Sequence, residues 1–547
     1  MIRSLNLENS AIAESEIQNR ILSLFARSDK AIAAERDMDG YLEAIANEFL
    51  QTTKIGSDIA LTDLNEQFTD YQIPIDPVDP DDYLNELTET AVAHSVRTSS
   101  PRFIGHMTTA LPYFVRPLAK LMTILNQNPV KTETAKSLTP YERQALATLH
   151  HLIYQLPDAF YIEHTHNPHS TLGMIVSGGT IANITALWCA RNAALAPQAD
   201  FMGVEQEGLA AALKFYGYDG AVVIGSSLMH FSFDKAADLL GIGTRSLIKI
   251  PANEKNQVDL RSLRQTIRDC RDRKQLILAI VGIAGTTDSG GIDPLLDMAE
   301  IAKNANIHFH VDAAWGGPML FSQRHRYKLQ GIEFADSVTI DGHKQLYLPM
   351  GIGMLFLHNP NLAKAIEKQA PYTVRQNSID LGKRTLEGSR PATAILLQAG
   401  LKLIGMKGYE YLMDWGIEKT WYLATRIEAM PEFERLIDPE INIFLYRYIP
   451  EPYRHRAAIG QLTLAENQSI NQFNQHLQKA QRQAGHTFIS RTTTYTTRYG
   501  KNVPIIALRA VIANPLTTEL DINAVIQDQL QIAADLSDNT SGSFLTQ

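Results

Sequence analysis

The stretch HVDAAWGGPMLFSQRHRYKLQGIEFADSVTIDGHK, residues 310–344, contains two apolar runs that each lead into a carboxylate. The run IHFHVD (307–312) ends at Asp312, and the run SVTI (337–340) is followed by Asp341-Gly342-His343-Lys344. Short apolar runs of this kind predict buried strands, and open α/β sheets bind ligands beyond the carboxyl ends of their strands. A carboxylate at such a place needs a charged or hydrogen-bonded partner, although it can also cap the next turn.

Further short β-rich runs occur on both sides of this stretch. They are GMIV (173–176), AVVIGS (221–226), SLIKI (246–250), LILAIVGIAG (276–285) and GIGMLFL (351–357). Helix-compatible segments separate most of them, for example residues 180–195 and 294–305. Continuous apolar strands that alternate with helices indicate a parallel sheet covered on both faces. The predicted fold class is therefore α/β with a mostly parallel central sheet.

The regions outside this sheet have a different pattern. The first hundred residues read as amphipathic helices and contain the Pro-rich segment YQIPIDPVDPDDY (71–83), which we expect to be a loop, either a linker or a wrap over another surface. After residue 390 a helical region leads to a strand, VPIIALRAVIA (503–513), and a helix near 521–535. We predict an N-terminal helical segment (1–100), a large domain (101–390) and a small C-terminal α+β domain (391–547).

Composition narrows the class of protein. The 547 residues include 59 acidic and 50 Lys+Arg side chains, and the resulting net charge of -9 argues against a nucleic-acid partner. Two cysteines, Cys189 and Cys270, are too few for a disulfide framework or a cysteine zinc site. No secretory signal is visible at the start, and the apolar run 276–285 is shorter than the about 18–20 residues of a membrane span. We expect a cytoplasmic enzyme without a membrane partner.

Ser177-Gly178-Gly179-Thr180 lies between a predicted strand and a predicted helix. Glycine permits close backbone approach, and a helix N-terminus offers free N–H groups and a positive dipole end to a phosphate. An ordinary turn capped by Thr180 is the alternative interpretation. The segment lacks the spacing of a dinucleotide fingerprint or a P-loop.

Lys344 and His230 indicate a cofactor site only in combination with other residues. Alone, Lys344 would be a surface lysine and His230 a core histidine. Together with Asp312 and the 177–180 turn, they supply what pyridoxal 5'-phosphate (PLP) requires. The phosphate needs a helix terminus, the pyridine nitrogen a carboxylate, and the aldehyde a lysine.

One other cluster suggests a metal. Glu163-His164-Thr165-His166-Asn167-Pro168-His169 is rich in ligand types, but it contains proline and lacks the helical spacing of a HExxH site. We expect a structural role for this segment and no metal.

Residues 310–344 resemble the central signature of the group II PLP-dependent amino acid decarboxylases. Segments 173–187, 282–295, 388–392 and 508–518 support the resemblance, and the likeness is greatest to glutamate-decarboxylase-like proteins such as bacterial aspartate 1-decarboxylases. The resemblance implies fold type I, PLP as the cofactor, and a homodimer with the active site at the subunit interface.

The resemblance also implies roles for the cofactor residues. Lys344 would form the Schiff base and Asp312 would pair with the pyridinium nitrogen. His230 would stack on the ring, and Gly179 and Thr180 would hold the phosphate.

Further residues follow from the same likeness. Ala314 would leave room beside the ring, Thr286 or Thr287 would face the 3'-oxygen side, and His343 would lie next to the Schiff base. Arg390 would grip the substrate carboxylate. Asp341-Gly342 departs from the more usual Asn-Pro, which leaves the contacts at the phosphate edge open.

The substrate pocket is less well defined by the sequence. His106 and Thr108, with Thr109, would line the side-chain pocket. The proton delivered to Cα would come from Tyr372, from His230 or from a partner subunit. A basic cluster of Arg375, Lys383, Arg384 and Arg390 either attracts an acidic substrate or forms a solvated loop.

The expected reaction is α-decarboxylation of aspartate to β-alanine. Glutamate to 4-aminobutyrate is one alternative, because the one methylene between aspartate and glutamate changes binding by only about 1–3 kcal/mol. Conversion of an aromatic amino acid to its amine is another. Aminotransfer or carbon–carbon lysis is a more distant alternative, since PLP supports both, and a non-catalytic relative is a third class.

Overall fold

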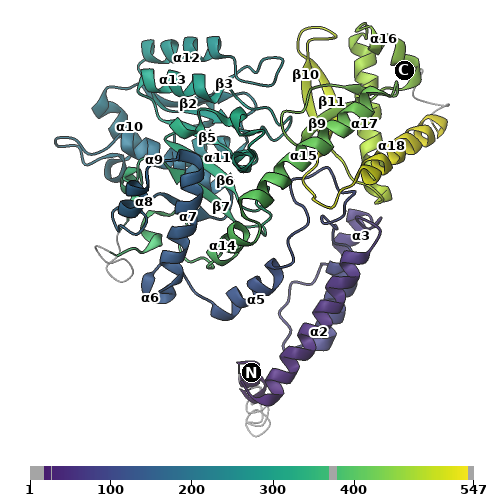
Figure 1. Cartoon of the computed structure of the whole chain (residues 1–547), viewed down its shortest axis with the longest axis horizontal. Helices are drawn as coiled ribbons and strands as arrows, with labels where there is room; N and C mark the ends of the chain where they lie inside the picture. The colour runs from purple at the N-terminus through teal and green to yellow at the C-terminus, as the bar shows by residue number, and fades with distance from the viewer. Residues whose placement is uncertain (1–17, 26, 369–377, 540–547) are drawn as a thin grey trace, which may run out of the picture. The chain divides into compact units, whose positions relative to one another are not determined.

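Two units make up the chain in the computed structural model, Met1–Arg97 and Thr98–Gln547. The structure describes residues 18–25, 27–368 and 378–539 (Figure 1). Within these residues the second unit contains two β-sheets, one of seven strands and one of four.

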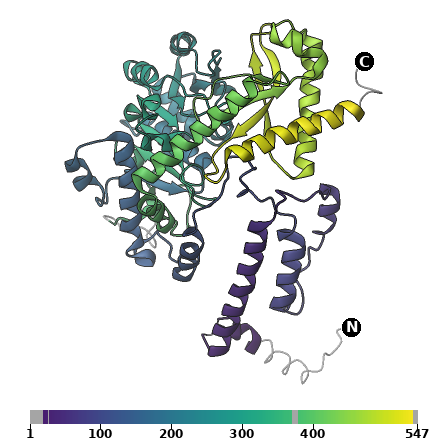
Figure 2. The same cartoon turned by 45° about the vertical axis from the view of Figure 1, so that its right-hand side comes forward.

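The first unit is helical, as predicted. Its elements are α2 (Asp29–Gln51), α3 (Leu61–Glu66), α4 (Pro80–Leu87) and the π-helical turn η1 (Thr88–Val92). The side chain of Ser28 accepts from Ala31 N and caps α2. Tyr41 Oη donates to Asn85 Oδ1 at 2.8 Å and joins α2 to α4. The two helices lie side by side in Figure 2.

The prediction of a loop over residues 71–83 was too long at its C-terminal end. The helix α4 already begins at Pro80, with Asp79 as its N-cap. Asp79 Oδ1 accepts from Asp81 N at 3.0 Å. Proline is favoured at the first helical position because the N–H that it lacks has no partner there.

The large sheet of the second unit has seven strands in the order β1-β7-β6-β5-β4-β2-β3. The strands are β1 (Gly173–Val176), β2 (Gly220–Ser226), β3 (Leu247–Ile250), β4 (Gln275–Ile283), β5 (Phe309–Asp312), β6 (Ser337–Asp341) and β7 (Gly353–Leu357). Each of the seven predicted runs is confirmed as a strand.

The direction of β7 differs from the prediction of parallel strands. It runs antiparallel to both of its neighbours, β1 and β6. Only residues 342–352 connect β6 to β7, and a parallel return would need a crossover of about a dozen residues or more, usually with a helix. The sheet is therefore mostly parallel.

Helices cover both faces of this sheet (Figure 1). They are α7 (Leu138–Tyr154), α9 (Gly179–Ala194), α11 (Ser232–Leu239), α12 (Leu260–Asp272) and α13 (Leu295–Ala305). In β2, Val222 and Ile224 pack in one cluster with α7, α12 and α13. Ala221 and Val223 pack in another with α9 and α11. This alternation is the period-2 pattern of a strand buried on both sides.

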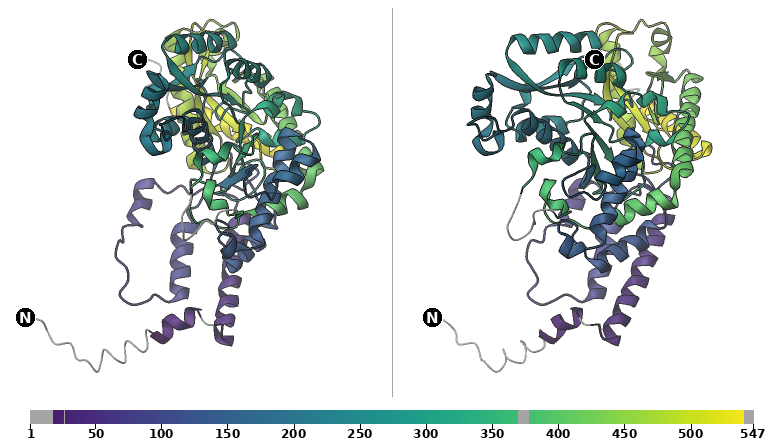
Figure 3. Two further views of the ribbon diagram at one scale, coloured as in Figure 1. Left: turned by 90° about the vertical axis from the view of Figure 1, so that its left-hand side faces the viewer. Right: turned by 60° about the vertical axis from the view of Figure 1, so that its left-hand side comes forward.

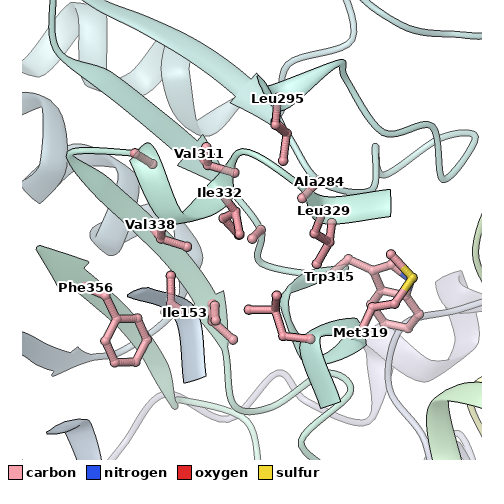
Figure 4. Packing of buried hydrophobic residues seen from close by; sticks show 14 of the residues in the cluster. Ile153, Ala284, Leu295, Val311, Trp315, Met319, Leu329, Ile332, Val338 and Phe356 are labelled. Carbon is pink, nitrogen blue, oxygen red and sulfur yellow. The ribbon is translucent and has the colours of Figure 1, made fainter. Parts of the chain in front are cut away.

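The main core lies directly behind the end of β5. Val311 and Val338 are fully buried, and Trp315, four residues after Val311, belongs to the same cluster (Figure 4). Dense apolar packing fixes side-chain and backbone positions. The strand ends that carry Asp312 and Asp341 are therefore rigidly supported.

A second, antiparallel sheet has the order β10-β11-β9-β8. Its elements cluster together in both views of Figure 3. They are β8 (Phe433–Arg435), β9 (Ile443–Tyr448), β10 (Ser490–Thr496) and β11 (Val503–Val511), with α15 (Gly405–Glu428), α17 (Leu464–Ala484) and α18 (Glu519–Asn539). The predicted final strand and helix are confirmed as β11 and α18, whereas β8, β9 and β10 were not predicted.

The remaining helices connect these layers. They are α5 (Val115–Leu125), α6 (Thr132–Ala135), α8 (Asp158–His164), α10 (Val204–Tyr216), α14 (Ala394–Leu403) and α16 (Arg454–Ala458). Within the described ranges, none of the helices has the length and apolar character that crossing a bilayer requires.

Candidate active site

Six strands of the large sheet end at one edge. Strands β2 to β6 are mutually parallel, and β1 shares their direction because β1 and β6 are both antiparallel to β7. The segments that follow these strands therefore meet, as predicted, at the ligand-binding edge of an α/β sheet.

A cup without side chains lies at the start of α9. Gly178 is the N-cap and Gly179 the first helical residue, so no side chain blocks the first N–H groups of the helix. A Cβ added at Gly179 would lie 2.9 Å from Asp341 Oδ2, which is closer than real Cβ atoms approach. Only glycine permits this approach, and free N–H groups at a helix N-terminus suit a phosphate.

Asp312 is buried, 7% exposed, and both of its oxygens are hydrogen-bonded. Oδ2 accepts from Asn183 Nδ2 at 2.9 Å, and Oδ1 accepts from the backbone N–H of Ala314 at 3.1 Å. These two donors fix the orientation of the carboxylate at the end of β5, where it can face a ring nitrogen.

Lys344 and Asp341 form an ion pair in the same place. Lys344 Nζ lies 3.0 Å from Asp341 Oδ2, while Asp341 Oδ1 is buried without a hydrogen-bond partner among the described residues. His343 Nδ1 lies 2.9 Å from the carbonyl of Ile352, so Nδ1 carries a proton. His343 Nε2 is 3.7 Å from Asp341 Oδ2, which places His343 beside the lysine.

His230 faces this cluster in its neutral form. Its Nδ1 lies 3.3 Å from Ser232 N, a donor, and 2.9 Å from Ser232 Oγ, so Nδ1 accepts and Nε2 carries the proton. Burial lowers the pKa of His230, Asp312 raises it and Lys344 lowers it. The structure thus brings His230, Asp312 and Lys344 together.

The two threonines after β4 occupy different positions. Thr286 is 1% exposed, and its hydroxyl is 2.8 Å from Ser289 Oγ and accepts from Gly291 N at 3.0 Å, so it holds the turn together. Thr287 is half-buried, and its carbonyl accepts from Arg509 Nε at 2.7 Å.

Arg509, on β11 of the small sheet, reaches the same region. Its Nη1 donates to Ser490 Oγ at 3.0 Å, and burial lowers its pKa to about 10. Nη1 of Arg509 also donates to the carbonyl of Gly105 at 3.4 Å, next to His106. His106 is partly covered but keeps an exposed side, and this partial burial and the charges of Arg509 and Lys344 lower its pKa. Its Nδ1 lies 2.9 Å from Thr108 Oγ1. Thr109 Oγ1 is buried without a hydrogen-bond partner in the described part of the chain.

Arg390 lies elsewhere. Its Nη1 donates to Glu142 Oε2 at 2.8 Å and its Nη2 to Glu142 Oε1, so the guanidinium is occupied by a bidentate pair. The side chains of Arg390 and Glu142 are 9% and 1% exposed. They line a cavity of about 30 Å³, roughly one water, whose lining includes neither Lys344 nor Asp312.

The predicted basic cluster is not at a pocket mouth. Lys383 and Arg384 are buried and line the same small cavity as Arg390. Arg384 donates to Glu367 Oε2 at 2.7 Å and to Thr171 Oγ1 at 2.8 Å. Because they are buried, Lys383 and Arg384 neither form a solvated loop nor attract substrate at a pocket mouth, and both predicted roles are wrong for them. Tyr372 and Arg375 lie outside the described residues.

The histidine-rich segment 163–169 is tied to the fold by Arg143. Arg143 donates to the carbonyls of Thr165 and Asn167 at 2.7 Å and of Ser170 at 2.9 Å. Among the residues that the structure describes, no cluster of three His, Cys, Asp or Glu side chains is arranged to hold a metal ion.

The donor set at this edge fits PLP. The glycine cup offers N–H groups for the phosphate, Asp312 offers an oriented carboxylate for the ring nitrogen, and Lys344 and a neutral imidazole complete the set. The two-sheet arrangement and this donor set are those of a fold type I PLP-dependent enzyme.

Solved structures share this fold. Mouse CSAD superposes with a TM-score of 0.80 at 23% identity, covering 93% of this chain and all of that one. Tryptophan decarboxylase from Catharanthus roseus gives a TM-score of 0.72 at 19% identity, covering 98% of this chain.

Sequence comparison defines the family. The pyridoxal-dependent decarboxylase conserved domain matches residues 64–449, and the chain belongs to this family of PLP-dependent carboxy-lyases. An aspartate 1-decarboxylase of Aliivibrio fischeri is 44% identical over 490 residues, 89% of each chain. An L-2,4-diaminobutyrate decarboxylase of Rhizobium meliloti is 29% identical over 67% of this chain and 68% of its own length.

Sequence reasoning missed two residues of this site, Arg509 and Asn183. Arg509 was visible as the only charge within the apolar run VPIIALRAVIA (503–513), where a buried cation needs a reason. Asn183 is a polar residue on the apolar face of a predicted helix, but such residues are common, and its partners lie far away in sequence.

Proposed function

We propose that this carboxy-lyase removes the α-carboxylate of L-aspartate and produces β-alanine and CO2. The observation that carries the proposal is the buried cation Arg509, whose Nη1 donates to the carbonyl of Gly105 at 3.4 Å, next to His106, and which suits a substrate carboxylate. The 44% identity to an aspartate 1-decarboxylase over most of both chains supports it.

Lys344 is the proposed nucleophile. Asp341 Oδ2 holds Lys344 Nζ at 3.0 Å, and the lysine attacks a carbonyl once it has given up its proton. His343 lies beside this pair, with Nε2 3.7 Å from Asp341 Oδ2. Gly179 and Thr180 are the proposed phosphate ligands at the start of α9.

Asp312 and His230 are proposed to hold the ring. When bound, PLP supplies an electron sink for the pair of electrons left by the departing CO2. Asp312 would face the ring nitrogen and stabilise its protonated form. His230 would cover one ring face, and the small Ala314, whose N–H donates to Asp312 Oδ1, would leave space at the ring edge.

Arg509 replaces Arg390 as the proposed carboxylate anchor, because Arg390 is already paired with Glu142. The bond that breaks must stand perpendicular to the ring, so the anchor decides which bond it is. His106 and Thr108 would bound the side-chain pocket next to Arg509, whose Nε donates to the carbonyl of Thr287. Thr286 supports the turn from behind.

His230 and Tyr372 are the two groups of this chain proposed to return a proton to Cα. His230 Nε2 carries a proton in the neutral ring, because Nδ1 accepts from Ser232. Tyr372 is a candidate through its sequence position alone. Replacing each with phenylalanine and comparing the rate of reprotonation in deuterated solvent separates them.

The test is a decarboxylation panel of Asp, Glu, Tyr, Trp, dihydroxyphenylalanine, His and cysteine sulfinate. We expect CO2 release to be fastest with aspartate, with β-alanine as product. Faster CO2 release from glutamate or an aromatic amino acid would make that amino acid the substrate in place of aspartate. Formation of a keto acid without CO2 would overturn the proposal of a decarboxylase. The visible absorbance of the lysine-bound cofactor should vanish in Lys344→Ala.

We also propose a homodimer, a cytoplasmic location, and a small domain that begins after residue 390. The family resemblance supports the dimer, and the separate antiparallel sheet within residues 433–511 supports the domain boundary. Sedimentation of the PLP-loaded protein tests the dimer, and a single monomeric species would reject it.

A further inference from the structure

We propose that Asn183, on α9, is a positioning residue that fixes both Asp312 and His230 for the cofactor ring. The inference rests on the PLP site described above and adds the residue that sets its geometry. Asn183 is 1% exposed and lies four residues after Gly179 at the cup. It touches neither substrate nor cofactor in this assignment and acts through its two neighbours.

The amide of Asn183 links the two groups directly. Its Nδ2 donates to Asp312 Oδ2 at 2.9 Å and to Ser232 Oγ at 3.0 Å. Because Ser232 Oγ accepts from Asn183, the serine directs its own proton to His230 Nδ1, 2.9 Å away. One amide group therefore orients the carboxylate and, through one hydroxyl, the imidazole.

The orientation of the amide is not interchangeable. Rotating it by half a turn would place its oxygen against Asp312 Oδ2, which also only accepts, and the carboxylate would lose a donor in a buried site. The amide oxygen must therefore face His310. His310 Nε2 lies 3.0 Å from Asn183 Oδ1 and so carries the proton in the neutral ring.

His310 is held in that tautomer by the layer behind it. It is fully buried, and its pKa is lowered to about 3, chiefly by burial and also by His308. Its Nδ1 lies 2.8 Å from Ser337 Oγ and accepts from that hydroxyl. His308 Nε2 lies 2.8 Å from the same oxygen. The chain of donors and acceptors from His308 to Asp312 thus has one consistent direction.

A plain structural role would look different. Asn192, on the same helix, is also buried, at 4% exposure, and its Nδ2 donates to the carbonyl of Ala365 at 2.9 Å. Asn192 bonds to structural groups only, namely this carbonyl and Arg191. Asn183 instead bonds to a carboxylate and a serine that face the ring site, which is why we separate the two.

The test uses the full-length protein and purified PLP. In Asn183→Ala, Asp312 loses one donor and the proton direction at His230 is no longer fixed. We expect PLP affinity, measured by titration of the visible absorbance, to fall about 10- to 100-fold, as expected for one hydrogen bond to a charged group. Asn183→Asp should lower PLP affinity further, because a second carboxylate then faces Asp312.

The matched control is Asn192→Ala. It removes a buried asparagine from the same helix and should lower the melting temperature without changing PLP affinity or the absorbance spectrum. A double-mutant cycle with Asn183→Ala and Asp312→Asn measures the coupling between the two side chains in PLP binding. If Asn183 acts through Asp312, then Asn183→Ala should cost less than about 3-fold in PLP affinity when Asp312→Asn is already present.

Wild-type PLP affinity and spectrum in folded Asn183→Ala would overturn the proposal, and so would an equal loss in Asn192→Ala. Full additivity in the cycle would also reject action through Asp312. These readouts do not involve aspartate, so failure of the substrate proposal would appear separately, as PLP binding without CO2 release in the wild type.

Discussion

Two arginines of this chain show how much a side chain's role depends on its partner. Arg390 and Arg509 are both largely buried, and burial of a guanidinium is costly without compensation. Arg390 is neutralised by Glu142 in a bidentate pair. Arg509 donates to the carbonyl of Thr287 and the hydroxyl of Ser490, which are neutral. The charge of Asp288 acts on Arg509 and raises its pKa, but among the described residues no carboxylate forms a bidentate pair with Arg509 as Glu142 does with Arg390.

Replacement of Arg509 by lysine is expected to reduce kcat/KM for aspartate by about 10- to 1000-fold, because an ammonium cannot grip a carboxylate with two parallel hydrogen bonds. The PLP absorbance should persist, since Arg509 does not hold the cofactor. Steady-state kinetics with aspartate measure the effect. Near-wild-type kcat/KM would remove Arg509 from the substrate site.

Replacement of Arg390 by alanine is expected to act on stability. It leaves Glu142, 1% exposed, as an unpaired buried charge, which costs about 3–5 kcal/mol. Urea denaturation measures the free energy of unfolding, and Arg390→Ala with Glu142→Ala should recover part of the loss. A wild-type unfolding free energy together with a large rise in KM would restore Arg390 as the anchor.

The sequence allowed only part of this residue-scale picture to be predicted. Asp312, Lys344 and His230 follow predicted strands, so their convergence could be derived from strand direction alone. The choice between Arg390 and Arg509 could not, because it depends on Glu142, which pairs with Arg390 across 248 residues. Such a pairing leaves no local pattern in a single sequence.

At the scale of elements, the strand pattern was predictable and its exceptions were not. Each run of the large sheet is continuous and apolar, which marks a buried strand. The reversed direction of β7 depends on the short 342–352 connection, and β10 has an exposed alternate side that resembles an ordinary polar segment. Both features are set by neighbouring strands, which a local pattern does not contain.

The junction between β4 and α13 contains a buried acid, Asp293. Its oxygens accept from Val258 N at 2.7 Å and from Ile283 N at 2.9 Å. Burial raises its pKa to about 7, the two backbone donors oppose this rise, and the nearby Glu440 adds to it. The folded chain therefore keeps a proton on Asp293 that the unfolded chain has released above its ordinary pKa near 4.

This junction predicts a stability that falls with rising pH. Between pH 4 and 7 the folded state binds more protons at Asp293 than the unfolded state, so the free energy of unfolding should decrease by up to about 4 kcal/mol and then level off. Urea denaturation at pH 5 and pH 8 measures it. Asp293→Asn should flatten this pH dependence, and an unchanged slope in that variant would contradict the assignment.

At the scale of the whole second unit, one amide joins the two sheets. Asn442, just before β9, accepts from Trp315 Nε1 at 3.0 Å and donates to Gln345 Oε1 at 2.9 Å and to the carbonyl of Ile512 at 3.1 Å. Gln345 Nε2 also donates to the carbonyl of Trp315 at 2.7 Å. Gln345 follows Lys344, so Asn442 fixes the small sheet relative to the lysine.

This bridge determines where Arg509 stands. Arg509 is three residues before Ile512, whose carbonyl Asn442 holds. Asn442→Ala should therefore lower the unfolding free energy by about 2–4 kcal/mol through unsatisfied buried groups, and raise KM for aspartate several-fold with a smaller change in kcat. Steady-state kinetics and urea denaturation measure the two effects.

The control for this prediction is Asn474→Ala. Asn474 is fully buried and, among the described residues, bonds to β9 and to its own helix α17: it accepts from Tyr448 N and donates to the carbonyls of Tyr448 and Ile470, all at 2.8 Å. It should destabilise the protein and leave KM unchanged. If Asn474→Ala raises KM as much as Asn442→Ala, general loosening of the small domain explains the effect. If only Asn442→Ala raises KM, the position of Arg509 relative to Lys344 depends on the hydrogen bonds of Asn442 between the two sheets.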